Sequence, residues 1–399
     1  MKYDLDKVID RTGTNSVKWD EIVLETWFKS KDLLPLWVAD MDFPCPKPVT
    51  DAIKKRAEHG IYGYSFHKLP SYNQAVADWM KRRHNWEIDS EWLVYSPGIV
   101  PAINMLIRTF TKTGEKVIIQ PPVYHPFLST VTKNGRILSL NQLKYENKRY
   151  TMDFKDLEEK AKDPLARMLI LCSPHNPVSR VWTKEELTRL GEICLENNVL
   201  VISDEIHQDL VLRENKHTVF ATISKEFEQN SVICTAPSKT FNIAGLHISN
   251  IIIPNKILRD SFEHTIVGQN GLMTPTCFGI VALEAAYNEG EEWLEQVLEY
   301  IEGNMDYIRE FVKNKLPEID FIEPEGTYLA WLDFRKLGMN GKELEEFMRT
   351  KAKVALNEGH TFGLGGEGFE RINAGCPRSI LEECMARIEK AIRGANKKH

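Results

Sequence analysis

The chain has 399 residues, of which 42% are hydrophobic and 27% are charged, and its net charge at pH 7 is −6. Basic and acidic residues are mixed along the sequence, which argues against a nucleic-acid partner and against a polybasic membrane patch. No apolar stretch approaches the roughly 18 residues that span a bilayer, and the length predicts two domains of unequal size.

The first two segments of the chain differ in their periodicity. Residues 1–45 show no strong pattern, which predicts an arm that crosses between domains or toward a second subunit and supplies part of the small domain. Residues 46–285 alternate short apolar runs with helical patterns, as expected for a large α/β domain with a mostly parallel mixed sheet covered by helices. The expected buried parallel strands span residues 116–120, 167–172, 199–203, 232–235 and 250–253. Between two of them, Thr183 as N-cap and Glu186 at the capping-box position predict a helix.

The pattern changes in residues 286–399, for which we expect a smaller α+β domain. A long acidic amphipathic stretch predicts a helix, and shorter apolar runs predict strands before a last helix. These elements are expected at residues 289–315 (helix), 327–333, 353–356 and 369–373 (strands) and 379–393 (helix).

Three polar motifs follow the expected strands of the large domain. Lys239 lies in S-K-T-F-N, among small and apolar neighbours that lower the pKa of an ammonium group by desolvation. Asp204 ends one apolar run, and Asn176 follows another. An aspartate at such a position is also a common helix N-cap, and Asn-Pro is a common turn former. Because ligands bind at the carboxyl ends of parallel strands, we expect these side chains to share one crevice.

An anion site is expected where a helix pattern starts. Ser96-Pro97-Gly98 follows a strand-like run, and a helix pattern extends from there to Phe110. Backbone N–H groups at a helix start bind phosphate, and Ile99 and Val100 are the expected donors because Pro101 has no N–H group. Tyr124 lies in a proline-rich turn, where it either packs or stacks on a ligand ring.

Other patterns suggest no site. The seven cysteines are odd in number and lack C-x-x-C spacing, which predicts a reduced, cytoplasmic protein without a structural metal. Cys172 and Cys234 are expected to be buried hydrophobes. Residues 363–368 match G-x-G-x-x-G, but a strand-like run follows them instead of a helix, so we reject a dinucleotide site.

Taken together, the motifs resemble those of pyridoxal phosphate enzymes of the aspartate aminotransferase fold (fold type I), and most closely the MalY/PatB group of cystathionine β-lyases, or C–S β-lyases. The resemblance covers nearly the whole chain. The segments that carry it are K-W-D at 18–20, L-W-V-A-D-M-D-F at 36–43, Y-G-Y at 62–64, S-P-H-N-P at 173–177, S-D-E-I-H at 203–207, S-K-T-F-N at 238–242 and R-I-N-A-G-C-P-R at 371–378.

The resemblance implies pyridoxal 5′-phosphate as cofactor and a role for each matching residue. Lys239 would form the Schiff base and act as acid and base at Cα, Asp204 would pair with the pyridine nitrogen, and Asn176 with the phenolate oxygen. Arg371 would hold the substrate α-carboxylate, with Ala39 beside the substrate. The other implied cofactor contacts are Tyr124, which would stack on the ring and assist catalysis, His207, and the phosphate ligands Ile99, Val100, Ser238 and Tyr64. Tyr64 would come from a neighbouring subunit, which implies a homodimer.

The sequence departs from the wider superfamily at the phosphate site. Ala236 and His247 occupy positions where many aminotransferases carry serine and arginine. His207 stands where many aminotransferases carry tyrosine and where the C–S lyase group carries histidine. The identity of the phosphate ligands is therefore open at this point.

The implied activity is a β-elimination that cleaves L-cystathionine, cysteine or another cysteine S-conjugate to a thiol, pyruvate and ammonia. Two alternatives stay open. A class I/II aminotransferase shares the carbanion and differs only in the step that follows it, and a cofactor-bound regulatory or binding protein could keep the fold with residual lyase activity.

Overall fold

Seven strands form the main sheet of this computed structural model, which describes residues 1–66, 68–272 and 274–396. The strand order is β2-β10-β9-β8-β7-β3-β4. The bounds are Leu93–Ser96 (β2), Lys116–Ile119 (β3), Ile137–Leu140 (β4), Ala166–Cys172 (β7), Leu200–Asp204 (β8), Ser231–Thr235 (β9) and Ser249–Ile252 (β10). Each strand expected in this sheet is present within one residue of its predicted ends, which confirms a mostly parallel, mixed sheet.

One expected direction is wrong. β4, β3, β7, β8 and β9 are parallel to their neighbours, whereas β10 is antiparallel to both β9 and β2. The run 250–253 is apolar because the strand is buried on both faces. Such a run reports burial but carries no information about strand direction.

Helices cover both faces of this sheet, and alternate residues of each strand enter two separate apolar cores. In β7, Met168 and Ile170 point to one core, and Leu169 and Leu171 point to the other. The first core is closed by α4 (Ile99–Phe110), α5 (Pro126–Lys133) and α10 (Lys256–Glu263). The second is closed by α2 (Lys47–Glu58), α3 (Pro70–His84), α6 (Phe154–Ala161), α7 (Lys184–Glu196), α8 (Lys225–Gln229) and α11 (Cys277–Glu289). The capping box of α7 at Thr183 and Glu186 is present as predicted.

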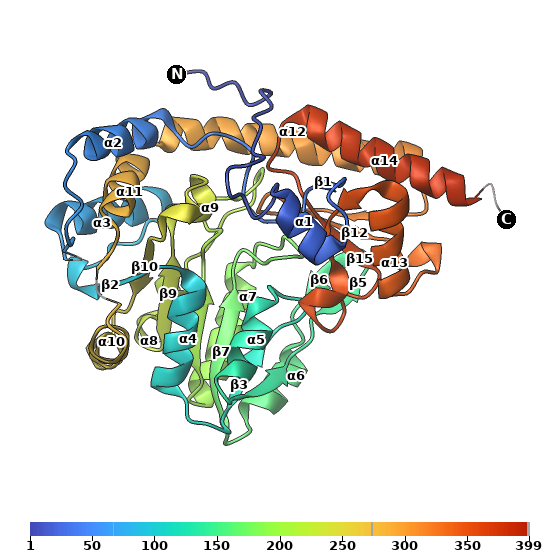
Figure 1. Ribbon diagram of the computed structural model, residues 1–399. Helices are drawn as coiled ribbons and strands as arrows, with labels where there is room; N and C mark the ends of the chain where they lie inside the picture. The colour runs from blue at the N-terminus through green and yellow to red at the C-terminus, as the bar shows by residue number, and fades with distance from the viewer. Residues whose placement is uncertain (67, 273, 397–399) are drawn as a thin grey trace.

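A second sheet follows in the chain, with the antiparallel order β11-β12-β15-β14. Its strands are Asp320–Ile322 (β11), Leu329–Asp333 (β12), Asn357–Glu358 (β14) and Phe369–Asn373 (β15), and its helices are α12 (Glu291–Lys315), α13 (Gly341–Phe347) and α14 (Arg378–Asn396). The long α12 runs along the top of the molecule, from near α11 to α14 (Figure 1). An α+β arrangement in this part of the chain agrees with the sequence, while the domain boundaries after residues 45 and 285 stay a prediction.

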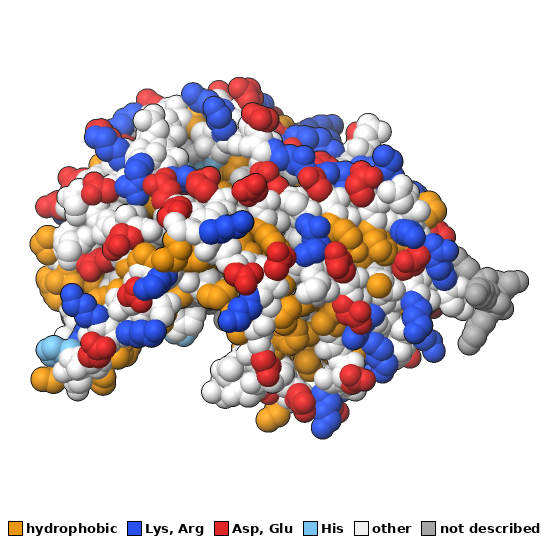
Figure 2. Space-filling view, turned by 90° about the horizontal axis from the view of Figure 1, so that it is seen from above, with side chains coloured by type: hydrophobic (Ala, Val, Ile, Leu, Met, Phe, Trp, Pro, Cys, Tyr) orange, Lys and Arg blue, Asp and Glu red, His pale blue; other side chains and the backbone are white. Residues whose placement is uncertain are grey.

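Short elements complete the described chain. The hairpin is β5 (Lys144–Glu146) with β6 (Arg149–Thr151), and the 3-10 and π turns are Ser90–Trp92, Phe220–Thr222, Ala244–Leu246, His264–Gln269, Arg335–Leu337, Met348–Ala352 and Gly359–Phe362. Seen from above, the face that carries α12 and α14 mixes acidic and basic side chains (Figure 2), as the sequence predicts. Within the described residues, no helix combines the length and apolar character of a membrane span.

The N-terminal arm contains a helix that the sequence did not predict. This helix, α1 (Glu21–Phe28), has 8 residues and buries only Leu24 and Phe28. Two buried positions are too few to show a clear helical period in the sequence. The arm then adds β1 (Leu34–Pro35), which pairs in parallel with β13 (Val354–Ala355). Beyond β1, the Met41 amide donates to Asn242 Oδ1 at 3.0 Å and the Asp42 amide to the Gly375 carbonyl at 2.8 Å. The arm therefore contacts one residue near the end of a strand in each sheet: Asn242 comes after β9, and Gly375 comes after β15.

Candidate active site

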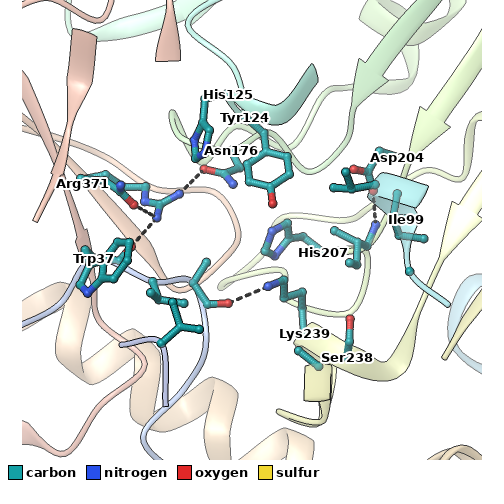
Figure 3. Close-up of a pocket in the computed structure, with 18 of the residues that line it drawn as sticks. Trp37, Ile99, Tyr124, His125, Asn176, Asp204, His207, Ser238, Lys239 and Arg371 are labelled. Carbon is teal, nitrogen blue, oxygen red and sulfur yellow. Dashed lines mark hydrogen bonds between the residues drawn. The ribbon is translucent and has the colours of Figure 1, made fainter. Parts of the chain in front are cut away.

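A cavity of about 790 Å³ lies at the carboxyl ends of β7, β8 and β9 and reaches across to β15. Asp204 ends β8, Asn176 follows β7, and Lys239 lies in α9 (Pro237–Thr240) directly after β9. Arg371 enters from β15 on the opposite side (Figure 3). The structure thus brings the three strand-end motifs to one crevice, because the carboxyl ends of parallel strands meet at one edge.

Lys239 points into the cavity and is half-buried. Its Nζ donates to the carbonyl oxygen of Ala39 at 2.8 Å (Figure 3). Burial lowers the pKa of this lysine, and the carboxylates of Asp40 and Asp204 only partly oppose that effect. This effect of burial confirms the expected desolvation of Lys239. An amine with a lowered pKa is a better nucleophile and base at neutral pH.

Asp204 is a buried carboxylate with little compensation. One of its oxygens accepts a hydrogen bond from the Ile206 amide at 3.2 Å, in a turn and not at a helix cap. Burial raises the pKa of Asp204 to about 7. A cationic N–H group placed beside this side chain would stabilise its ionised form.

His207 lines the same part of the cavity in its neutral form. Burial lowers its pKa to about 3, and its Nδ1 atom is buried and has no hydrogen-bond partner among the described residues. The ring packs edge-on against Tyr328 at 6.0 Å between centroids.

Arg371 is held in a fixed orientation by groups from three segments. Its Nη1 donates to Asn176 Oδ1 at 2.9 Å, and its Nη2 donates to the Trp37 carbonyl at 2.6 Å and to Asn357 Oδ1. Burial lowers the pKa of Arg371 to about 10. Because the Asn176 oxygen already accepts from Arg371, its amide nitrogen is the atom left to donate to a ligand; it bonds to nothing in the described chain. Tyr124, beside Asn176, donates its backbone N–H to the Asn176 carbonyl at 3.0 Å.

The start of α4 forms another wall of the cavity. Ile99 and Val100 occupy its first two positions, after Gly98, which offers no side-chain cap. The first N–H groups of the helix are therefore left to a ligand, and an anion is the group they attract. Ser238 and His247 also line the cavity, whereas Ala236 is buried and does not line it. Of the two residues that depart from the superfamily pattern, His247 is thus the one that lies at the cavity.

Tyr64 is the one predicted site residue that lies apart. Its side chain is fully exposed and does not line the cavity of its own chain. Other lining residues were not expected from the sequence, among them Trp37, His125, Glu345, Glu358 and His360. Trp37 stands in the L-W-V-A-D motif, which gave the only local signal for any of them.

The donor set fits pyridoxal phosphate. An amine of lowered pKa, a nearly unpaired buried carboxylate and a helix start without a cap match the aldehyde, the protonated ring nitrogen and the phosphate of that molecule. The Asn176 amide and the His207 ring add neutral polar groups between these points. The cofactor would be held by Lys239, Asp204, Asn176, Tyr124, His207, Ile99, Val100 and Ser238.

Comparisons with a family profile and with known proteins agree on the family to which the chain is similar. The profile of the family "Aminotransferase class I and II" matches residues 31–388. Cystathionine beta-lyase PatB of Bacillus subtilis is 46% identical, over 98% of this chain and 100% of that protein. Protein MalY of Escherichia coli is 36% identical, over 98% of this chain and 99% of that protein.

Solved structures agree. Cystalysin from Treponema denticola, which contains pyridoxal 5′-phosphate, has a TM-score of 0.95 and 39% identity, covering 99% of this chain and 100% of that chain. A pyridoxal phosphate-bound C–S lyase from Staphylococcus hominis has a TM-score of 0.91 and 33% identity, covering 98% of both chains. The architecture of the chain is therefore that of fold type I.

Proposed function

This chain belongs to the aminotransferase class I and II family, and from that membership we propose that it is a pyridoxal phosphate-dependent C–S β-lyase. It cleaves L-cystathionine or a related cysteine S-conjugate, with one water molecule, to a thiol, pyruvate and ammonia. The observation that carries the proposal is the convergence of Lys239, Asp204 and Arg371 on one cavity, in a chain 46% identical to a cystathionine β-lyase.

Bound pyridoxal phosphate supplies an electron sink for the charge that develops at Cα of an amino acid. Asp204 keeps a proton on the ring nitrogen, because the buried carboxylate is stabilised in its ionised form by that cation. Lys239 removes the Cα proton, since burial lowers the pKa of its amine and so favours the form that accepts a proton. Tyr124 and Asn176 orient the ring. The bond from Cβ to sulfur then breaks, and the thiolate leaves.

Arg371 fixes the substrate through its α-carboxylate. Its guanidinium lies in the cavity and is oriented by Asn176, Asn357 and the Trp37 carbonyl, so little ordering remains to be done when a carboxylate arrives. A planar guanidinium binds a carboxylate through two parallel hydrogen bonds.

Replacing Arg371 with alanine is expected to weaken substrate binding by about 2–5 kcal/mol, because the α-carboxylate loses a buried charged partner. The measurement is KM for L-cystathionine at saturating cofactor. Arg371→Lys is the matched variant: it keeps the charge but loses the planar fork, and we expect an intermediate KM. Unchanged KM in Arg371→Ala would assign the α-carboxylate to another residue.

The reaction type is tested by the products. Purified holoenzyme is incubated with L-cystathionine, with and without a keto acid, and pyruvate and free thiol are measured. A C–S lyase releases both without the keto acid. Product formation that requires the keto acid would identify an aminotransferase instead.

We also propose a homodimer in which Tyr64 of one subunit completes the phosphate site of the other. Ile61, Tyr62, Tyr64 and Phe66 are exposed by 57–101%, and such a run of large apolar side chains favours burial against a partner. Sedimentation equilibrium at micromolar concentration is expected to give twice the mass of 46.0 kDa. A monomer that binds the cofactor at full affinity would contradict the proposal. A cytoplasmic location stays a prediction.

A further inference from the structure

Three glutamates lie together at one side of the active-site cavity. Glu345 of α13 and Glu358 of β14 line the cavity. Glu370 of β15 is the direct cross-strand partner of Glu358. Directly opposed residues of an antiparallel pair stand on the same face of the sheet, so the carboxyl groups of Glu358 and Glu370 are neighbours.

This acidic wall (Glu345, Glu358 and Glu370) is only partly compensated, by Arg371, which lies within electrostatic reach of Glu358. Among residues 1–66, 68–272 and 274–396, none of the three takes part in an ion pair. Both carboxyl oxygens of Glu370 are buried without a hydrogen-bond partner. Burial and the neighbouring acids raise the pKa of Glu358 to about 7 and that of Glu370 well above its usual range. Unpaired buried polar groups of this kind are costly, and a site that keeps them is expected to have a use for them.

Arg371 lies between Asn176 and the strand that carries Glu358. One end of the guanidinium bonds Asn176, and the other bonds Asn357, the residue that precedes Glu358. Arg371 is within electrostatic reach of both Lys239 and Glu358. Glu345 and Glu358 line the same cavity as Arg371 and Lys239, so the S-substituent of a substrate bound to Arg371 has room to extend toward them.

We propose that Glu345 and Glu358 form a subsite that selects substrates whose S-substituent carries a primary ammonium group. The inference rests on the proposed lyase function and names the substrate class of that site. An ammonium group is compact and has three donors, so it can bond both carboxylates at once. It also brings a positive charge, which stabilises the ionised form of Glu358 against the effect of burial.

The test uses two compounds that differ only in this group. L-cystathionine carries the distal ammonium, and S-(3-carboxypropyl)-L-cysteine has hydrogen in its place. The ratio of kcat/KM for the two is measured in the wild type, Glu345→Gln, Glu358→Gln and the double variant. Glu346→Gln is the matched control, because Glu346 is an exposed neighbour in α13 that does not line the cavity.

The wild type is expected to prefer L-cystathionine by about 10-fold or more, as for a hydrogen bond to a charged group, and the double variant is expected to lose that preference. Glu346→Gln should keep it. A preference that is absent, or unchanged in both single variants and the double variant, overturns the subsite. Glutamine is isosteric, and thermal unfolding of each variant checks that the wall still folds; if Glu358→Gln does not fold, Glu345→Gln alone decides.

Failure of the lyase function is distinguished by binding. If neither compound is cleaved, the proposed function fails, and calorimetric titration of the holoenzyme with the same two compounds decides on the subsite alone. Tighter binding of L-cystathionine that is lost in the double variant supports the subsite. Equal dissociation constants overturn it.

Discussion

Lys239→Ala is expected to abolish turnover, with kcat/KM for L-cystathionine reduced by about 10⁴-fold or more. General acid–base catalysis by a placed side chain contributes about 10²–10⁴-fold, and this variant also loses the covalent anchor of the cofactor. The alanine cannot take the Cα proton, and no other described side chain of lowered pKa shares its position at the Ala39 carbonyl. Turnover and the visible absorbance of the holoenzyme are the two measurements.

The matched control is Lys155→Ala, which removes an exposed lysine of α6 and should leave both readouts unchanged. Adding a small primary amine to Lys239→Ala is expected to restore part of the rate, because the amine can carry the proton in solution. A Lys239→Ala protein that is yellow and fully active would show that another residue holds the cofactor.

The parts of the site that sequence predicted are those that follow buried strands. Asn176, Asp204 and Lys239 each come directly after an apolar run, and the carboxyl ends of parallel strands meet by geometry. The local pattern therefore carried their convergence. Arg371 is different, because nothing near β15 indicates that it faces a sheet formed by residues far earlier in the chain. Only the resemblance to a family placed it.

Other features depend on contacts between distant segments, and no local pattern reports them. The direction of β10 follows from its pairing with β2 and β9, whereas its composition reports only burial. The pairing of Glu358 with Glu370 depends on the register of β14 against β15. α1 is too short for a helical period to be visible. These are the points at which sequence-based expectations stopped or were wrong.

The N-terminal arm reaches the active site through a buried ion pair. Lys18 Nζ lies 2.6 Å from Asp42 Oδ2, and both side chains are almost completely buried. Arg11 and the Trp19 indole donate to the other Asp42 oxygen at 2.6 and 2.8 Å. The same segment presents the Ala39 carbonyl to Lys239. The ion pair therefore fixes the backbone segment whose Ala39 carbonyl accepts the hydrogen bond from Lys239.

Lys18→Met is expected to lower the free energy of unfolding by about 3–5 kcal/mol, because it leaves the Asp42 carboxylate buried with one of its two charged partners removed. Denaturant titration measures the change. Lys47→Met is the control, since the Lys47–Asp51 pair is half-exposed and contributes less than about 1 kcal/mol. Replacing both buried partners, in Lys18→Met with Asp42→Leu, should recover part of the loss if the cost comes from the unpaired carboxylate. A Lys18→Met protein within about 1 kcal/mol of the wild type would mean that Arg11 alone compensates Asp42, and that the arm is held at Asn242 and Gly375 instead.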